Sequence, residues 1–224
     1  MMASMLSGPA VYKVPDRLLS VISNEYDAAT YMAAKSVDEK MEHHVNNALA
    51  EDLNFKQWLH AMPADMPPEL EAYQHDYPLD DFRPVDAAIH RIGASLSYDQ
   101  FLFHGGDLQI PEDEILVTER PLSTTFCPQV ALREADWDGK AYEANCICIY
   151  VLRIASPHAR VFVFDPKASE KGNEKEVLFA SGVRLIQRSE LEVRNDFLVY
   201  RVAGDGMQFS SKPVSCYVRE VDVY

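Results

Sequence analysis

The sequence predicts an α+β fold, with a helical region in the first hundred residues followed by a mainly antiparallel core of two packed sheets. Apolar residues before Ser97 recur at helical spacing, whereas those after it form short runs bounded by turn residues. The strands do not alternate regularly with helices, which favours antiparallel sheets. We therefore divide the chain into a flexible N-terminus (1–14), a helical region (15–96) and a core (97–224).

Each expected helix rests on a local signal. Apolar residues keep a helical period from Asp16 to Lys35. The segment Ser36-Val37-Asp38-Glu39 has the pattern of a capping box and opens a second helix that runs to about Ala61. Prolines from Met62 to Pro68 then break the pattern. Two further helices are expected in the helical region and one inside the core, over 69–73, 84–93 and 129–135.

The expected strands are the apolar runs rich in β-branched and aromatic residues. They cover 101–103, 115–117, 146–152, 160–164, 176–179, 183–186, 197–202 and 215–224. Cys146 and Cys148 alternate within one of these runs, and the cysteines lack the spacing of a zinc site. We expect no metal and a reducing compartment.

Composition narrows the classes of function. The formal net charge of −14 argues against nucleic-acid binding and fits a partner with a basic surface. We expect no membrane association, because no run approaches the length of a membrane-spanning helix. The first residues lack the pattern of a secretory signal. The expected location is the cytoplasm, or the cytoplasm of a target cell reached by a route without a classical signal peptide.

The segment Glu174-Lys175-Glu176 carries the strongest chemical signal. In an extended chain the side chains of Glu174 and Glu176 would point to the same side, about 7 Å apart, at the mouth of an apolar strand. Desolvating two carboxylates is costly and is usually tolerated for chemistry or for a cation. The alternative is an ordinary solvated strand end.

Two other segments share this chemical character. His104 ends an apolar strand and precedes Gly105 and Gly106, which leave the backbone open to a flat ligand. Ser123-Thr124-Thr125 places hydroxyl groups along a strand, where they can orient a carboxylate. Taken alone, each of these segments is also compatible with a purely structural role.

In this order the three segments resemble the mono-ADP-ribosyltransferase family, in its toxin-like or effector-like, arginine-modifying branch. That branch carries an Arg at a strand end, then Ser-Thr-Ser, then Glu-x-Glu before an apolar strand. Ser123-Thr124-Thr125 departs from the second motif at its last residue, while Glu174-Lys175-Glu176 matches the third. His104 replaces the Arg and, with Gly105, is more similar to the poly-ADP-ribosyltransferase branch. The resemblance covers about residues 85–224.

The resemblance implies a cleft that binds NAD as co-substrate. In it, Glu176 would stabilise the ribosyl cation and Glu174 would position the acceptor. Ser123 and Thr124 belong to the motif that orients Glu176, and the Gly105 backbone would hold the nicotinamide amide. His104 would contact the adenosine ribose or support the cleft. Phe126 would either stack on nicotinamide or belong to the core. The loop Asp165 to Asn173 stands where relatives carry a target-recognition loop, and a plain surface hairpin is the alternative.

The function expected from the resemblance is an NAD-dependent glycosyltransferase that moves ADP-ribose to a side chain of a target protein, arginine above all, and releases nicotinamide. Two alternatives remain open at this point. One is an NAD glycohydrolase, in which water replaces the acceptor. The other is a degenerate member of the family that binds a partner without chemistry. Only His104 favours the degenerate protein, and the intact pair of glutamates opposes it.

Overall fold

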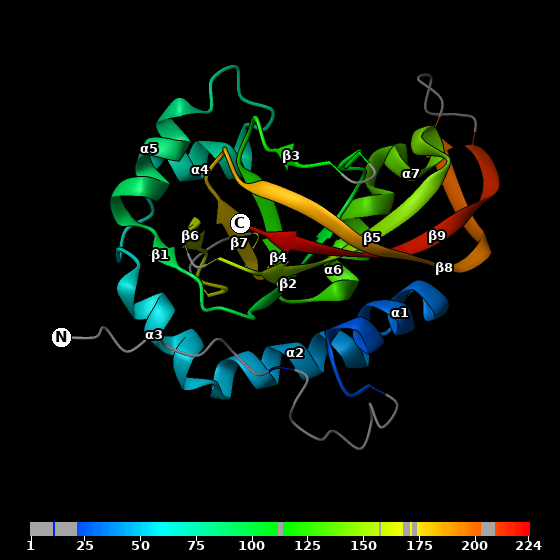
Figure 1. Cartoon of the computed structure of the whole chain (residues 1–224), viewed down its shortest axis with the longest axis horizontal. Coiled ribbons are helices and arrows are strands. Elements are labelled where there is room, and N and C mark those ends of the chain that lie inside the picture. Colours follow the sequence, from blue (N-terminus) through cyan, green and yellow to red (C-terminus); the bar gives the residue numbers. More distant parts are fainter. Residues whose placement is uncertain are drawn as a thin grey trace.

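A computed structural model describes residues 11, 22–111, 114–156, 158–167, 171, 174–202 and 209–224. Helices and a mixed sheet make up an α+β fold, as the sequence predicts (Figure 1). The helices are α1 (Glu25–Lys35), α2 (Glu39–Glu51), α3 (Leu53–Ala61), α4 (Pro68–His75), α5 (Arg83–Ile92), α6 (Pro128–Asp136), the 3₁₀ turn η2 (Trp137–Gly139) and α7 (Lys140–Ala144).

Caps account for several differences from the expected helices. Asn24 caps α1 by accepting a hydrogen bond from the Asp27 N–H, so that helix begins at Glu25. Residues 16–21 lie outside the described part of the chain, as do residues 1–10 and 12–14 of the expected flexible terminus. The expected second helix is divided at Asp52, which ends α2 and caps α3 by accepting from the Phe55 N–H.

The described strands are β1 (Ala94–Ser95), β2 (Phe101–Gly105), β3 (Leu116–Val117), β4 (Leu122–Thr125), β5 (Cys146–Ile154), β6 (Arg160–Val163), β7 (Glu176–Phe179), β8 (Arg184–Val202) and β9 (Phe209–Val223). Among these described strands, β5 and β9 are the only pair that runs in parallel. The two strands expected at 183–186 and 197–202 are one long strand, β8, which pairs with β9 through several register shifts. Its middle was missed because residues 187–192 are polar or exposed.

The two-sheet detail of our expectation is not confirmed. Hydrogen bonds join the described strands into one sheet in the order β1-β6-β7-β4-β2-β5-β9-β8-β3. Within the described residues, β2 and β4 meet at a single pair, Phe103 opposite Thr125. The two strands separate beyond that pair, toward Gly105 and Ser123, and this separation opens the sheet at its centre.

The helical region and the core share their hydrophobic interior. Figure 1 shows α1, α2 and α3 following one side of the sheet, with α4 and α5 at the end where β6 and β7 lie. Met32 and Met41 belong to the same buried cluster as Phe103 and Tyr150. A second cluster joins α4 and α5 to β6 and β7 through Leu70, Ile89, Phe162 and Leu178. The helices thus fix the strands that frame the opening.

Candidate active site

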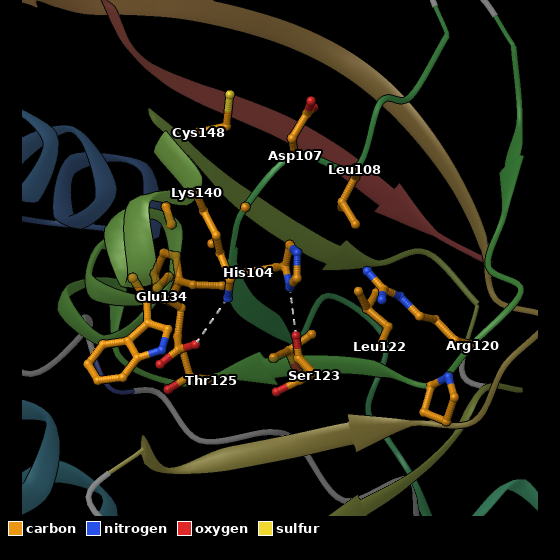
Figure 2. A pocket seen from close by; sticks show the side chains of 18 of the residues that line it. His104, Asp107, Leu108, Arg120, Leu122, Ser123, Thr125, Glu134, Lys140 and Cys148 are labelled. Atoms are coloured by element: carbon orange, nitrogen blue, oxygen red, sulfur yellow. Dashed lines mark hydrogen bonds and ion pairs between the residues drawn. The ribbon is translucent and has the colours of Figure 1, made fainter. Parts of the chain in front are cut away.

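A cleft of about 1390 Å³ lies where β2 and β4 separate. Its lining comes from these strands, from α4, α6 and α7, and from the segment that connects β2 to β4. His104, Gly105, Ser123, Thr124, Glu174 and Glu176 are among the lining residues. Figure 2 shows His104 and Ser123 facing one another across the strand opening. The structure therefore brings the three sequence motifs together in one cavity.

Glu176, the first residue of β7, is held by two donors. Ser123 Oγ donates to its Oε1 at 2.6 Å, and Gln74 Nε2 donates to its Oε2 at 2.8 Å. The side chain is buried, and burial raises the pKa of this carboxyl, while the hydrogen bonds from Ser123 and Gln74 oppose that rise. A carboxylate held in one orientation and shielded from water is suited to stabilising a cation beside it.

Glu174 lies at the edge of the same cleft and is half-buried. Burial raises its pKa to about 7, with a further contribution from the neighbouring carboxylate of Glu176. The segment is not the extended strand that we expected, because Lys175 has a left-handed φ of 52° and β7 begins only at Glu176. Both glutamates nevertheless line the cleft, as the motif implies.

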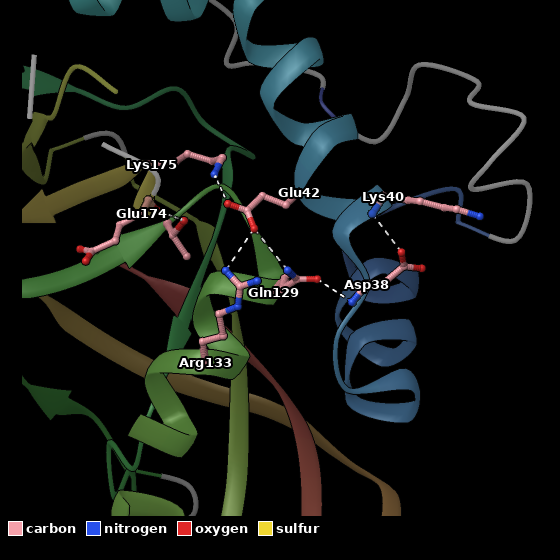
Figure 3. Close-up of polar contacts among 8 residues, drawn as sticks. Asp38, Lys40, Glu42, Gln129, Arg133, Glu174 and Lys175 are labelled. Atoms are coloured by element: carbon pink, nitrogen blue, oxygen red, sulfur yellow. Dashed lines mark hydrogen bonds and ion pairs between the residues drawn. The ribbon is translucent and has the colours of Figure 1, made fainter. Parts of the chain in front are cut away.

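Lys175 is turned away from the cleft and buried against the helical region. Its ammonium lies 3.3 Å from Oε1 of Glu42 on α2. The other oxygen of Glu42 accepts from Arg133 at 3.1 Å and from Gln129 at 3.3 Å, both on α6 (Figure 3). Figure 3 also shows Glu174 pointing away from this cluster. Glu42 therefore ties the middle of the Glu-x-Glu segment to two helices.

The three residues of the second motif, Ser123, Thr124 and Thr125, have different hydrogen-bond partners because side chains alternate between the two faces of β4. Thr125, two residues after Ser123, donates through its hydroxyl to the main-chain carbonyl of Glu174 at 2.6 Å. The Thr124 hydroxyl donates to the carbonyl of Val177 at 2.6 Å. This hydrogen bond joins β4 to β7, so the hydroxyl proton is engaged within the sheet. Phe126 is a core residue that packs against Phe55 and Trp58. Of the two expectations for Phe126, the structure supports the core residue and not stacking on nicotinamide.

His104 is a neutral hydrogen-bonding group. Its Nδ1 lies 2.7 Å from the carbonyl oxygen of Ser123, which can only accept, so Nδ1 carries the proton. The imidazole pKa is lowered to about 4, chiefly by burial and to a smaller extent by charge repulsion from Arg120 and Lys140, while the hydrogen bond to Ser123 opposes this shift. Near pH 7 the ring is therefore uncharged, and Nε2 is a hydrogen-bond acceptor.

The backbone of Gly105 faces the strand opening. In an antiparallel ladder, residue pairs joined by backbone hydrogen bonds alternate with pairs that are not. The N–H of Gly106 donates to the carbonyl of Cys148 on β5, so Gly106 belongs to a hydrogen-bonded pair and Gly105, opposite Ile149, does not. The amide and carbonyl of Gly105, one residue earlier, therefore point away from β5 toward β4. The glycine is also required for packing, because a Cβ at this position would lie 1.6 Å from the carbonyl oxygen of Ala131 on α6. The sequence predicts only the close approach of a ligand at Gly105, and this packing against α6 is an additional requirement.

Several lining residues were missed by sequence reasoning. Gln74 contacts Glu176 from α4, which is far away in the chain. Arg120 lies between β3 and β4 with its guanidinium against the Tyr77 hydroxyl. Lys171 donates to the main-chain carbonyl of Gln74 at 2.5 Å. It belongs to the loop 165–173, of which residues 168–170, 172 and 173 lie outside the described residues. A lone Gln or Arg carries no motif, so no sequence signal identified these side chains.

Two further features concern the part of the chain that the structure describes. In it, no group of three or more His, Cys, Asp or Glu side chains is arranged to hold a metal ion. None of its helices combines the length and the apolar character needed to cross a membrane. The described cysteines are free thiols, and Cys146 and Cys148 are 3.7 Å apart at their sulfur atoms.

Comparisons with known proteins find likeness in fold. No protein-family model matches the chain, and no curated protein is similar in sequence. The ADP-ribosyltransferase Vis of Vibrio splendidus, solved with agmatine, shares 15% identity over 96% of this chain and 89% of Vis, with a TM-score of 0.46. C2-I, the enzymatic component of the C2 toxin of Clostridium botulinum, shares 9% identity over 76% of this chain, with a TM-score of 0.45.

The ADP-ribosylating toxin BECa of Clostridium perfringens, solved with NADH, shares 13% identity over 90% of this chain, with a TM-score of 0.37. The chain spans 45% of the length of C2-I and 49% of that of BECa. All of these likenesses are distant.

Proposed function

We propose that the chain is a mono-ADP-ribosyltransferase that uses NAD as co-substrate and modifies a side chain of a target protein. The observation that carries this proposal is the Glu176 carboxylate, held by Ser123 and Gln74 in the cleft where β2 and β4 separate. Glycosyl transfer from NAD needs such a group, because the bond between ribose and nicotinamide breaks through a state with positive charge on the ribose.

Glu176 stabilises that charge. As the glycosidic C–N bond breaks, its electron pair moves to the nicotinamide nitrogen, and the ribose carbon becomes cationic. A carboxylate whose orientation is already fixed by two hydrogen bonds stabilises this cation without having to reorganise. The Gly105 amide and carbonyl, which face the cleft, are placed to hold the carboxamide of nicotinamide.

Glu174 receives the acceptor. A guanidinium has a pKa above about 12 and must lose a proton as its nitrogen attacks the ribose carbon. A carboxylate at the edge of the cleft binds the guanidinium in charge-assisted hydrogen bonds and takes that proton. We therefore propose arginine as the modified residue. The net charge of −14 favours a target protein with a basic surface.

We further propose that the chain consists of a helical region, residues 15–96, and a catalytic core, residues 97–224. Helix α4 of the helical region contributes Gln74 to the site. We propose that the protein acts in a cytoplasm, its own or that of a target cell.

Incubation with NAD labelled in the adenylate phosphate, together with a mixed protein lysate, tests the function. Label that becomes attached to protein and is released by hydroxylamine supports transfer to arginine. Free labelled ADP-ribose without labelled protein identifies an NAD glycohydrolase instead. If NAD is recovered intact, with neither labelled protein nor free ADP-ribose, the proposal is overturned and the chain is a binding protein without this chemistry.

A further inference from the structure

Position 104 supplies no positive charge to the cleft. His104 donates from Nδ1 to the Ser123 carbonyl at 2.7 Å, so the other ring nitrogen, Nε2, has only a lone pair to offer. A nitrogen lone pair accepts hydrogen bonds from hydroxyl groups but repels the negatively charged oxygens of a phosphate. NAD carries a diphosphate, so a cleft that binds it needs cationic donors elsewhere.

The lining of the cleft contains few such donors. Among its described residues the cations are Arg120, Lys140 and Lys171, against the carboxylates of Asp107, Glu119, Glu134, Glu143, Glu174 and Glu176. With this excess of negative charge, a diphosphate can be bound only close to one of the cations. The position of each cation therefore decides where the diphosphate lies.

Lys171 belongs to the glutamate end of the cleft. Its ammonium donates to the Gln74 carbonyl, and its charge lowers the pKa of both Glu174 and Glu176. Lys140 lies 4.0 Å from the Glu134 carboxylate, a distance that leaves only a loose ion pair. Figure 2 shows Lys140 and Arg120 on either side of His104.

Arg120 is the cation best placed for an anion. Its guanidinium is held by the Tyr77 hydroxyl and lies over the Tyr77 ring at 5.9 Å. Within the described part of the chain no carboxylate forms an ion pair with it, which leaves most of its donors available. A guanidinium oriented by an aromatic ring presents a planar fork that fits two phosphate oxygens.

We propose that Arg120, oriented by Tyr77, forms a diphosphate subsite, because position 104 contributes no cation to the cleft. The proposal rests on the proposed use of NAD. In this arrangement NAD extends from Glu176, past the neutral His104, to the guanidinium of Arg120. The subsite binds the diphosphate and has no part in breaking the glycosidic bond.

Calorimetric titration with ADP-ribose and with NAD, in the wild type and in Arg120→Gln, tests the subsite. We expect Arg120→Gln to weaken the binding of both ligands about 10- to 100-fold, as loss of a charge-assisted contact does. Arg120→Lys should retain part of the affinity. The matched control is Arg83→Gln, which removes an exposed arginine on α5 that pairs with Asp81 outside the cleft. It should bind both ligands as the wild type does.

The outcomes separate this subsite from the proposed function. Binding by Arg120→Gln at wild-type affinity would overturn the subsite and leave the transferase proposal intact. Equal weakening in Arg83→Gln would also overturn it, because the effect would then be one of overall charge. A wild-type protein that binds neither ADP-ribose nor NAD would overturn the proposed function itself. A selective loss in Arg120→Gln, with unchanged melting, supports the subsite.

Discussion

The Lys175 ammonium lies 3.3 Å from the Glu42 carboxylate, so the middle residue of the Glu-x-Glu segment points away from the cleft and into the helical region. Lys175 adopts a left-handed backbone conformation, which is uncommon for a residue with a side chain. Its contact with Glu42 therefore fixes the turn from which Glu174 and Glu176 both reach the cleft. Helix α2 thus holds the Glu-x-Glu segment in place.

Replacing Glu42 with Gln tests this link. The side chain of Lys175 is 1% exposed and that of Glu42 19%, so the pair is poorly screened by water. We expect the free energy of unfolding to fall by about 1–3 kcal/mol and transfer activity to fall several-fold. Urea unfolding and initial rates measure the two effects. Glu51→Gln, an exposed change on the same helix, is the control. If Glu42→Gln is destabilised but transfers ADP-ribose at the wild-type rate, the contact between Glu42 and Lys175 contributes to stability alone.

Replacing Glu176 with Gln should leave folding and NAD binding nearly intact while removing both transfer and NAD hydrolysis. The amide keeps the size of the side chain but carries no charge to stabilise the ribosyl cation. We expect a loss of roughly 10²–10³ in rate, which corresponds to a few kcal/mol of transition-state stabilisation. Calorimetric NAD titration and turnover assays measure binding and rate separately. Wild-type turnover in this variant would refute the role of Glu176.

The sequence predicted the parts of the site whose residues are close together in the chain. Glu174 and Glu176 were found through their spacing, and the Ser-Thr-Thr segment was found through its hydroxyls. Gln74 and Arg120 were not predicted, because each reaches the cleft through tertiary packing and carries no local pattern. The place of Phe126 stayed open for a related reason, since the same aromatic side chain suits a ligand or a core. The sheet order likewise depends on contacts between distant strands.

His104→Ala should raise the Michaelis constant for NAD more than it lowers turnover. The imidazole bridges β2 and β4 through the Ser123 carbonyl and offers Nε2 to the cleft, so its loss affects binding first. Because its pKa is held to about 4, the variant should show the same dependence on pH as the wild type between about pH 5.5 and 8. Steady-state kinetics across that range check both points. An unchanged Michaelis constant would make His104 a structural residue, and His104→Arg would ask whether the cleft admits a larger cation.

Gly105→Ala should prevent normal folding. Its Cβ would lie 1.6 Å from the Ala131 carbonyl oxygen, so α6 would have to move away from β2. Gly182→Ala is the matched control, because Gly182 has a φ of +86° but a Cβ added there would meet no other atom within 4 Å. That change should cost about 1 kcal/mol through backbone strain alone. Soluble yield and thermal melting compare the two variants. A well-folded Gly105→Ala would show that α6 can shift at little cost.

Transfer and NAD hydrolysis should respond differently to pH, because only transfer needs Glu174 as a base. The pKa of Glu174 is raised to about 7, first by burial and then by the Glu176 carboxylate. Below that pKa Glu174 is protonated and cannot accept the proton of a guanidinium, so transfer to arginine should rise as pH increases through about 7. Water needs no such base, and NAD hydrolysis should therefore lack this rise. Glu174→Gln should lose most transfer, keep much of the hydrolysis and abolish the rise.

The same pKa determines the effect of Glu174 on stability. The folded state holds the proton of Glu174 more tightly than the unfolded chain, in which the pKa is near 4.5, so this residue reduces stability as pH rises from about 4.5 through 7. Since the side chain is only half-buried, Glu174→Gln should stabilise the protein at about pH 8 by no more than about 1–2 kcal/mol, and hardly at all at about pH 4. Thermal melting at both pH values measures this difference. If transfer and hydrolysis fall together in Glu174→Gln, Glu174 is not the base for the acceptor, and arginine loses its support as the modified residue. If the melting temperature at the higher pH does not rise either, the Glu174 carboxylate does not destabilise the folded protein.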